Sequence, residues 1–502
     1  MPRRFQPADW TVPLQRAMTG LAAVSAGLLA WQSAAPAKFL TAGLCIDRVT
    51  ALFGLLVSGI GAITMHYAQR ALAGDPSQAR FMALLAGAVA AAWVTAMADS
   101  MPVMIVACLA QGMAVHGLLT IRSDRPQALL PARTSFLVGR VGDMFLLAAF
   151  ALAWRDWGTL SVSTFVGAVA SGDAAPPTSI AVLLALAAIA KSAQVPFHAW
   201  LPETMEAPTP VSALMHAGIV NAGGVLLVRL APAVAQAPVA CLILALAGTA
   251  TVVIGMPAMW AQVKVKRELA WSTVAQMGFM TVQCGLAAFP AVALHVLGHG
   301  CYKAWSFLRA GEVPAPSGPA PRFGRALALI MVGGSCAMPL ILAAGSMLGM
   351  DILHSPGECA LAGVLAISIG QAWAALLGTD RGASPRRVAL ALVALGSMAM
   401  LGPLAWVGMA AFLAPVIGTP ALGQTTLGWT TAAVPVIAVA CLAVLHAALP
   451  YLHRLPWGLA FHVHALNGFY LGTATERVVD AAWPTDARRG AGTAPSTHDA
   501  HA

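Results

Sequence analysis

Residues 191–229, KSAQVPFHAWLPETMEAPTPVSALMHAGIVNAGGVLLVR, place ionisable side chains and four prolines between long apolar runs. Lys191 and His216 are the residues in it that most need an explanation. An ionisable side chain at membrane depth costs at least a few kcal/mol and is by default a functional-site hypothesis. The stretch therefore predicts both the class of fold and the centre of a site.

The remainder of the chain is mostly apolar. Of its 502 residues, 59% are hydrophobic and only 9% are charged, and the mean hydropathy is +0.77; soluble domains carry about 25% charged residues. Apolar runs of about 20 residues, the length that crosses a ~30 Å hydrocarbon core, recur from end to end. They are too long for barrel strands. We expect an all-α, polytopic membrane bundle at 14–471, a cytoplasmic lead at 1–13 and a disordered cytoplasmic tail at 472–502.

The net charge of +9 follows membrane topology and does not indicate nucleic-acid binding. The segments between apolar runs lie alternately on the two sides of the membrane. Five clusters of basic residues occur in segments on the same side as Arg3 and Arg4. By the positive-inside rule this side is cytoplasmic, which predicts both termini inside and about fourteen spans. The clusters are Arg70 and Arg80; Arg122, Arg125 and Arg133; Lys264, Lys266 and Arg267; Arg309, Arg322 and Arg325; and Arg381, Arg386 and Arg387.

Two places have the pattern of a broken helix. One lies between Pro196 and Pro210, after a helix that begins near residue 178 and carries Lys191; the other is the run at 345–351, GSMLGMD. Paired interruptions of this kind indicate an ion site in inverted-repeat transporters.

Several ionisable residues lie inside the apolar runs. A lysine removed from water holds its proton less tightly, so Lys191 and Lys303 can exchange protons near neutral pH; snorkelling to an interface is the alternative. His295, His299 and Lys303 are spaced i, i+4, i+8 and share one helix face. They predict either a proton relay or hydrogen-bonded core histidines.

Further polar residues accompany these. Arg140 and Asp143, at i and i+3, can pair on one helix face, and they either tune Lys191 or neutralise one another. His216 follows the proline-opened start of the next helix and is the candidate acceptor after Lys191.

Other classes of site lack their signatures. The sequence contains no dinucleotide or phosphate loop, no HExxH and no GxSxG. Its eight cysteines are scattered singly, without ligand spacing, and are interpreted as buried small hydrophobes. The N-terminus has no cleavage site of the kind that follows a signal peptide. We expect a transport subunit that is not an enzyme and holds neither a cofactor nor a metal.

The quoted stretch, together with VGRVGDMF, KRELAWSTVAQMGFM and HVLGHGCYKAWSFLRAGEV, resembles the antiporter-like subunits of respiratory complex I and of multisubunit cation/proton antiporters. The resemblance runs in order from about Asp47 to about Asp351. It implies a bundle of about fourteen helices with two inverted five-helix repeats, each containing a discontinuous helix.

The resemblance also implies an ion path through the bundle. The family's central lysine corresponds to Lys191, its following histidine to His216, and its His/Lys stripe to His295, His299 and Lys303. Two positions depart from the family pattern. Gln111 stands where the family has a glutamate, and Gly349 and Met350 stand at the distal charged position, where Asp351 is the nearest ionisable group. Because a glutamine cannot exchange protons at pH 7, Asp143 is the predicted acidic neighbour of Lys191, in contact directly or through one water.

The C-terminal segment HVHALNGFYLGTATERVVDAAWP is similar to the end of the membrane subunits of Dab inorganic carbon transporters. That similarity implies a subunit of the bacterial inner membrane in which protons or another cation drive a large cytoplasmic DabA-like partner. The implied partner binds zinc and resembles a β-carbonic anhydrase. The alternatives are a complex I-like pump subunit, a cation/proton antiporter module and a membrane anchor without an ion path.

Overall fold

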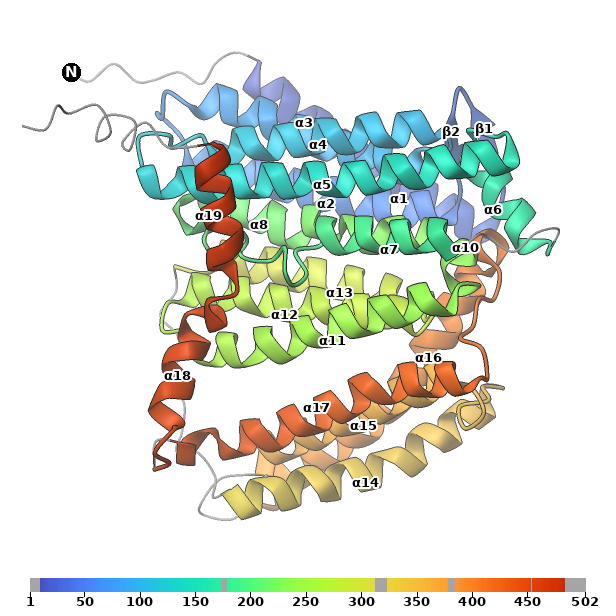
Figure 1. Ribbon diagram of the computed structural model, residues 1–502, viewed down its shortest axis with the longest axis vertical. Helices are drawn as coiled ribbons and strands as arrows, with labels where there is room; N and C mark the ends of the chain where they lie inside the picture. The colour runs from blue at the N-terminus through green and yellow to red at the C-terminus, as the bar shows by residue number, and fades with distance from the viewer. Residues whose placement is uncertain (1–9, 173–177, 312–322, 378–383, 453, 484–502) are drawn as a thin grey trace, which may run out of the picture.

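A computed structural model describes residues 10–172, 178–311, 323–377, 384–452 and 454–483. Helices that lie side by side and roughly parallel make up nearly all of it (Figure 1). In the first half the elements are α1 (Thr11–Ala34), β1 (Phe39–Thr41), β2 (Leu44–Ile46), α2 (Arg48–Ala71), α3 (Gln78–Met97), α4 (Met101–Leu119), α5 (Pro126–Trp157), α6 (Val162–Ala170), α7 (Thr178–Lys191), η1 (Thr204–Glu206), α8 (Thr209–Ala217), η2 (Ile219–Asn221) and α9 (Ala222–Arg229).

The second half continues the same bundle and ends in short helices. Its elements are α10 (Ala231–Ala235), α11 (Pro238–Trp260), α12 (Val265–Gly285), α13 (Phe289–Leu308), α14 (Phe323–Met347), α15 (Pro356–Leu377), α16 (Pro385–Ile417), α17 (Thr426–Leu452), α18 (Gly458–Leu466), η3 (Gly468–Tyr470) and α19 (Gly472–Ala482).

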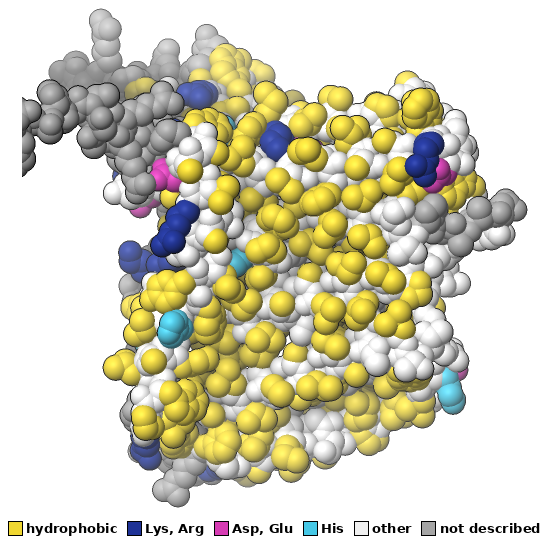
Figure 2. All heavy atoms as spheres, viewed as in Figure 1, with side chains coloured by type: hydrophobic (Ala, Val, Ile, Leu, Met, Phe, Trp, Pro, Cys, Tyr) yellow, Lys and Arg dark blue, Asp and Glu magenta, His cyan; other side chains and the backbone are white. Residues whose placement is uncertain are grey.

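The membrane prediction is confirmed by the length and composition of these helices. Within the described residues, ten helices are long and apolar enough to span a membrane, counting α8 to α9 as one. The predicted count of about fourteen is not confirmed; α1, α12 and α13 have the length but are not among the ten. The flank in Figure 2 is covered mainly by hydrophobic side chains, as a surface facing lipid tails requires.

The all-α class is confirmed, and a small antiparallel hairpin of β1 and β2 precedes α2. Two local expectations need correction. The run at 345–351 contains the end of α14 and part of the turn before α15, so it connects two helices and does not interrupt one. The tail was expected to be disordered from residue 472, but Gly472–Ala482 form α19; the remaining tail residues, 484–502, lie outside the described ranges.

The break after Lys191 is confirmed. Helix α7 ends at Lys191, and an irregular segment at 192–208 leads to α8, which begins at Thr209. Close packing holds the segment, because a Cβ on Gly223 of α9 would lie 2.4 Å from Ser192 Oγ. The backbone N–H of Gly223 donates to that same oxygen at 3.1 Å. The sequence of small residues after His216 thus lets α9 close on the end of α7.

The core is one large cluster and two small ones. The large cluster lies mainly in α2 to α13 and also takes in a few residues of α1, α15, α16 and α17, whereas the small clusters lie among α14, α15, α16 and α17 alone. Helices α11 and α12 pack closely because their glycines carry no side chain at the crossing: a Cβ on Gly248 would lie 2.6 Å from Gly278 O. The last four long helices therefore form a sub-bundle beside the main core.

Candidate ion pathway

The predicted contact between Lys191 and Asp143 is present. Lys191 Nζ donates to Asp143 Oδ1, and Arg140 Nη2 lies 2.7 Å from Asp143 Oδ2. The side chains of Lys191 and Asp143 are only 9% and 7% exposed, so Lys191 does not snorkel to an interface. One carboxylate on α5 therefore bridges two cations, one from its own helix and one from the end of α7.

Small residues make this three-way contact possible. A Cβ on Gly142 would lie 3.1 Å from Lys191 Cγ, so the glycine lets α5 approach α7. On α4, a Cβ on Gly112 would lie 2.5 Å from Arg140 Nη2, so the guanidinium rests against the helix that carries Gln111. Gln111 itself is buried. The acidic partner of Lys191 is therefore supplied by α5.

His216 is buried completely and stacks on Phe307, with ring centroids 4.4 Å apart. Neither ring nitrogen has a hydrogen-bond partner among the described residues. The backbone carbonyl of His216 accepts a hydrogen bond from His299 Nε2 at 3.3 Å, so Nε2 is the protonated nitrogen of His299. Buried polar atoms without protein partners usually bind water. His216 thus links the end of α8 to the polar stripe of α13.

The stripe on α13 has the predicted geometry. The rings of His295 and His299 lie 5.8 Å apart, and His295 Nδ1 is 3.1 Å from Gln283 Oε1. Lys303 is 1% exposed and donates to the carbonyl of Leu269 at 3.0 Å and to the hydroxyl of Ser272. Because Lys303 is held inside the bundle, it does not snorkel either.

A cavity of about 840 Å³ opens beside this stripe, between α12, α13 and the sub-bundle. His295, His299 and Lys303 line it, together with Glu358 at the start of α15. Glu358 Oε2 is buried and has no hydrogen-bond partner among the described residues. An unpartnered carboxylate oxygen in a cavity shared with a lysine and two histidines is a candidate proton carrier.

Asp351, predicted as the distal ionisable group, does not join the cavity. Its side chain is 69% exposed and pairs with His354 at 2.7 Å, in the turn between α14 and α15. Glu358 was not predicted, because Ser355-Pro356-Gly357-Glu358 follows the S-x-x-E pattern of a helix start, which has a purely structural explanation. The sequence feature that could have identified Glu358 is a glutamate followed directly by a long apolar run.

Metal ligation finds no support in the parts of the chain that the structure describes. No group of three or more histidine, cysteine, aspartate or glutamate side chains lies close enough to hold an ion there. The eight cysteines are all free. The prediction that all of them are buried is wrong for four: Cys301, Cys336 and Cys441 are exposed, and Cys359 is half-buried. The candidate site consists of ionisable and hydrogen-bonding side chains.

Known proteins share this arrangement of helices. The family model described as NADH:quinone oxidoreductase/Mrp antiporter, transmembrane, matches residues 98–376. A probable inorganic carbon transporter subunit DabB2 of Halothiobacillus neapolitanus is 38% identical over 304 residues, 60% of this chain and 53% of that protein. NADH-quinone oxidoreductase subunit L of Mycobacterium tuberculosis is 38% identical over 274 residues, 54% of this chain and 43% of that protein.

Solved structures agree with the sequence matches. A chain of the Mrp complex from Dietzia sp. is 28% identical, with a TM-score of 0.54 over 97% of this chain and 56% of that one. The chain spans about half the length of the curated relatives it matches. The family match covers more than half of the 502 residues, including α4 to α14 and nearly all of α15. The chain therefore belongs to the NADH:quinone oxidoreductase/Mrp antiporter transmembrane family.

Proposed function

We propose that this chain is the membrane subunit of an energy-coupled inorganic carbon pump of the bacterial inner membrane. Protons, or another cation, pass through it toward the cytoplasm and drive a large cytoplasmic partner that carries zinc and hydrates carbon dioxide. The chain itself is a transport subunit, and its termini lie in the cytoplasm by the positive-inside rule. The first relatives reported are named probable inorganic carbon transporter subunits, which supports this choice within the family.

The observation that carries the proposal is the sequence of buried ionisable groups across the bundle. Asp143 holds Lys191 at the end of a broken helix, and His216 reaches the stripe of His299 and Lys303 through its backbone. Burial of such groups inside an apolar bundle is unfavourable in free energy, and a purely structural anchor would have no reason to contain them. The path then opens into the cavity that Glu358 lines.

Each group has a chemical part in this path. Lys191 exchanges a proton while Asp143 and Arg140 set the local charge. Water bridges Lys191 to His216, where Ser212 Oγ and both histidine ring nitrogens are buried without protein partners. His295, His299 and Lys303 relay protons along one helix face, because neighbouring groups in this series lie one helical turn apart.

The test is growth rescue in a carbonic-anhydrase-deficient bacterial host that expresses this chain with its partner. Lys191→Ala is expected to abolish rescue in ambient air while both subunits remain in the membrane. Asp156→Asn, which alters an exposed ion pair at the far end of α5, serves as the matched control and should rescue fully. Full rescue by Lys191→Ala would show that the proposed path is wrong.

A pump subunit of a complex I-like assembly is the second candidate, favoured by the similarity to subunit L. The two candidates differ in what copurifies with the chain. A zinc-containing protein with carbonic anhydrase-like sequence supports the carbon pump, whereas quinone-reducing subunits support the second candidate. Small antiporter subunits would indicate a cation/proton antiporter.

A further inference from the structure

A second cavity, of about 810 Å³, lies at one end of the bundle under the last helices of the described chain. Helices α18 and α19 run across the ends of the bundle helices (Figure 1), and residues 458–482 are called the strap here. The cavity lies between the strap, the segment 192–208 and the nearby ends of α5 and α12. It therefore adjoins the segment that leads from Lys191 to α8.

The strap packs closely on that segment. A Cβ on Gly472 would lie 2.5 Å from Ala199 Cβ, and a Cβ on Gly468 would lie 2.5 Å from the Trp271 ring. At the other end of α19, Arg133 Nη1 donates to the carbonyl of Trp483 at 2.9 Å. The strap therefore packs closely over the cavity and covers it.

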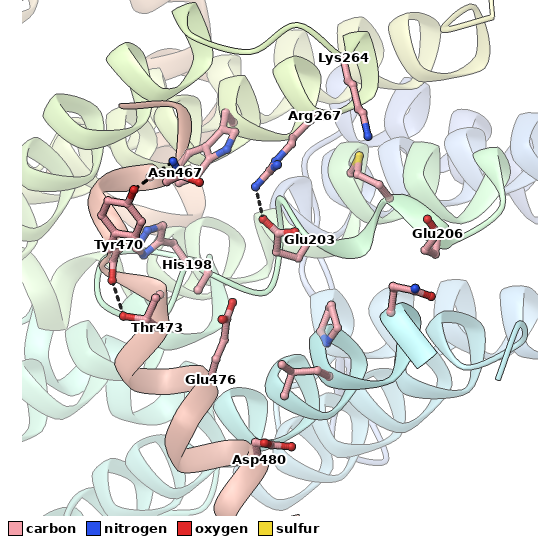
Figure 3. A pocket seen from close by; sticks show the side chains of 18 residues that line it. His198, Glu203, Glu206, Lys264, Arg267, Asn467, Tyr470, Thr473, Glu476 and Asp480 are labelled. Atoms are coloured by element: carbon pink, nitrogen blue, oxygen red, sulfur yellow. Dashed lines mark hydrogen bonds and ion pairs between the residues drawn. The ribbon is translucent and has the colours of Figure 1, made fainter. Parts of the chain in front are cut away.

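Carboxylates outnumber basic side chains in the cavity lining. Glu203 is paired with Arg267 at 2.5 Å, and Glu476 projects from α19 toward the segment that carries Glu203 (Figure 3). Four acidic residues line the cavity against two basic ones: Glu203, Glu206, Glu476 and Asp480 against Lys264 and Arg267. This charge balance favours cations and protons and disfavours a bound anion.

Buried polar atoms around the cavity lack protein partners. His198 is 1% exposed and lines the cavity, and its Nδ1 has no hydrogen-bond partner among the described residues; the same is true of Nε1 of Trp271, which is 4% exposed. Gln194 Oε1, between His198 and Lys191 in sequence, is also buried and unpartnered. Such atoms need water, so they mark a hydrated route between the cavity and the end of α7.

The carboxyl group of Glu476 is suited to proton exchange at this place. Burial raises its pKa above the ordinary value for glutamate, and the charge of Glu203 raises it further. The other ionisable groups that line the same cavity are Lys264, Arg267, His198, Tyr470, Asp480 and Glu206, which pairs with Arg125. Arg133 lies beyond them on α5, where it holds Trp483.

We propose that Glu476 and His198 form a proton-exchange site at the cytoplasmic end of the ion path, joined to Lys191 by water along segment 192–208. The inference rests on the proposed function. A proton that leaves Lys191 passes through water and His198, binds the Glu476 carboxylate and is released to bulk water. Only O–H and N–H bonds form and break in this step, and each group returns to its starting state.

The experiment measures proton flux in proteoliposomes that contain the chain with its partner, with the pH on the strap side varied. In the original protein, flux is expected to rise with pH through the titration of Glu476, because only the carboxylate accepts a proton. Glu476→Gln should lower flux at the plateau by at least about tenfold, as loss of a proton-transfer group does, and should remove this rise. Glu203→Gln should shift the midpoint to lower pH, because the charge that raises the pKa of Glu476 is gone.

The controls separate this site from the path as a whole. Asp156→Asn, also a carboxylate-to-amide change, should keep the original profile, and Lys191→Ala should lose flux at every pH. A Glu476→Gln profile that overlaps that of Asp156→Asn would overturn the inference while leaving the path intact. Unchanged flux in Lys191→Ala would instead overturn the proposed function. If Glu476→Gln fails to enter the membrane, the midpoint of the Glu203→Gln profile decides alone. An unchanged midpoint would then overturn the proposed site.

Discussion

Replacing Asp143 with asparagine tests the centre of the path most directly. The change keeps the size of the side chain but removes the charge shared by Lys191 and Arg140. Removing one partner of a buried ion pair costs roughly 3–5 kcal/mol. With the two side chains 9% and 7% exposed, solvent screening does not reduce that figure much.

The lower end of this range sets the expected loss of flux. At about 1.4 kcal/mol per factor of ten, ~3 kcal/mol lowers the population of molecules that keep Lys191 in its place against α5 about 100-fold. We therefore expect proton flux through Asp143→Asn to fall by about two orders of magnitude in proteoliposomes, with Asp143→Glu retaining most of it. Flux within twofold of the original protein, at equal protein content, would refute the reasoning.

Four other substitutions separate stability from transport. Asp47→Asn breaks the buried ion pair that Asp47 makes with Arg229 between α2 and α9. Thermal unfolding in detergent should show that the free energy of unfolding falls by roughly 3–5 kcal/mol. An unchanged unfolding midpoint would contradict this. At Gly285 even an added Cβ would lie 2.5 Å from the backbone of α11. Gly285→Val should therefore lower the folded yield, consistent with overpacking of at least about 1–3 kcal/mol. Glu358→Gln should reduce flux at least about tenfold, whereas Asp351→Asn should not; the reverse result would restore the distal role to Asp351.

Much of the fold can be predicted from the sequence because the hydrocarbon core of a membrane allows the backbone few conformations. In a membrane every peptide group needs an internal partner, so long apolar runs become helices. Prolines near Lys191 predicted the break after α7, since a proline cannot donate its share of the helix hydrogen bonds. The run at 345–351 showed the same kind of interruption, yet it marks a turn, because local composition does not reveal whether the chain continues or reverses.

Within the candidate site, contacts along one helix were predictable and contacts between helices were only partly so. His295, His299 and Lys303 share a face through the helical period alone. The pairing of Lys191 with Asp143 followed from the absence of a glutamate at Gln111. Glu358 could not be assigned, because its place depends on where the sub-bundle sets α15 across the cavity from α13.

The strap also fixes an order of assembly. Its contacts are with Ala199, Trp271 and Arg133, all of which leave the ribosome well before α19 does. Until α19 emerges, the proposed hydrated route toward Lys191 has no cover on that side of the bundle. That cover can therefore form only after every segment that it contacts has been synthesised.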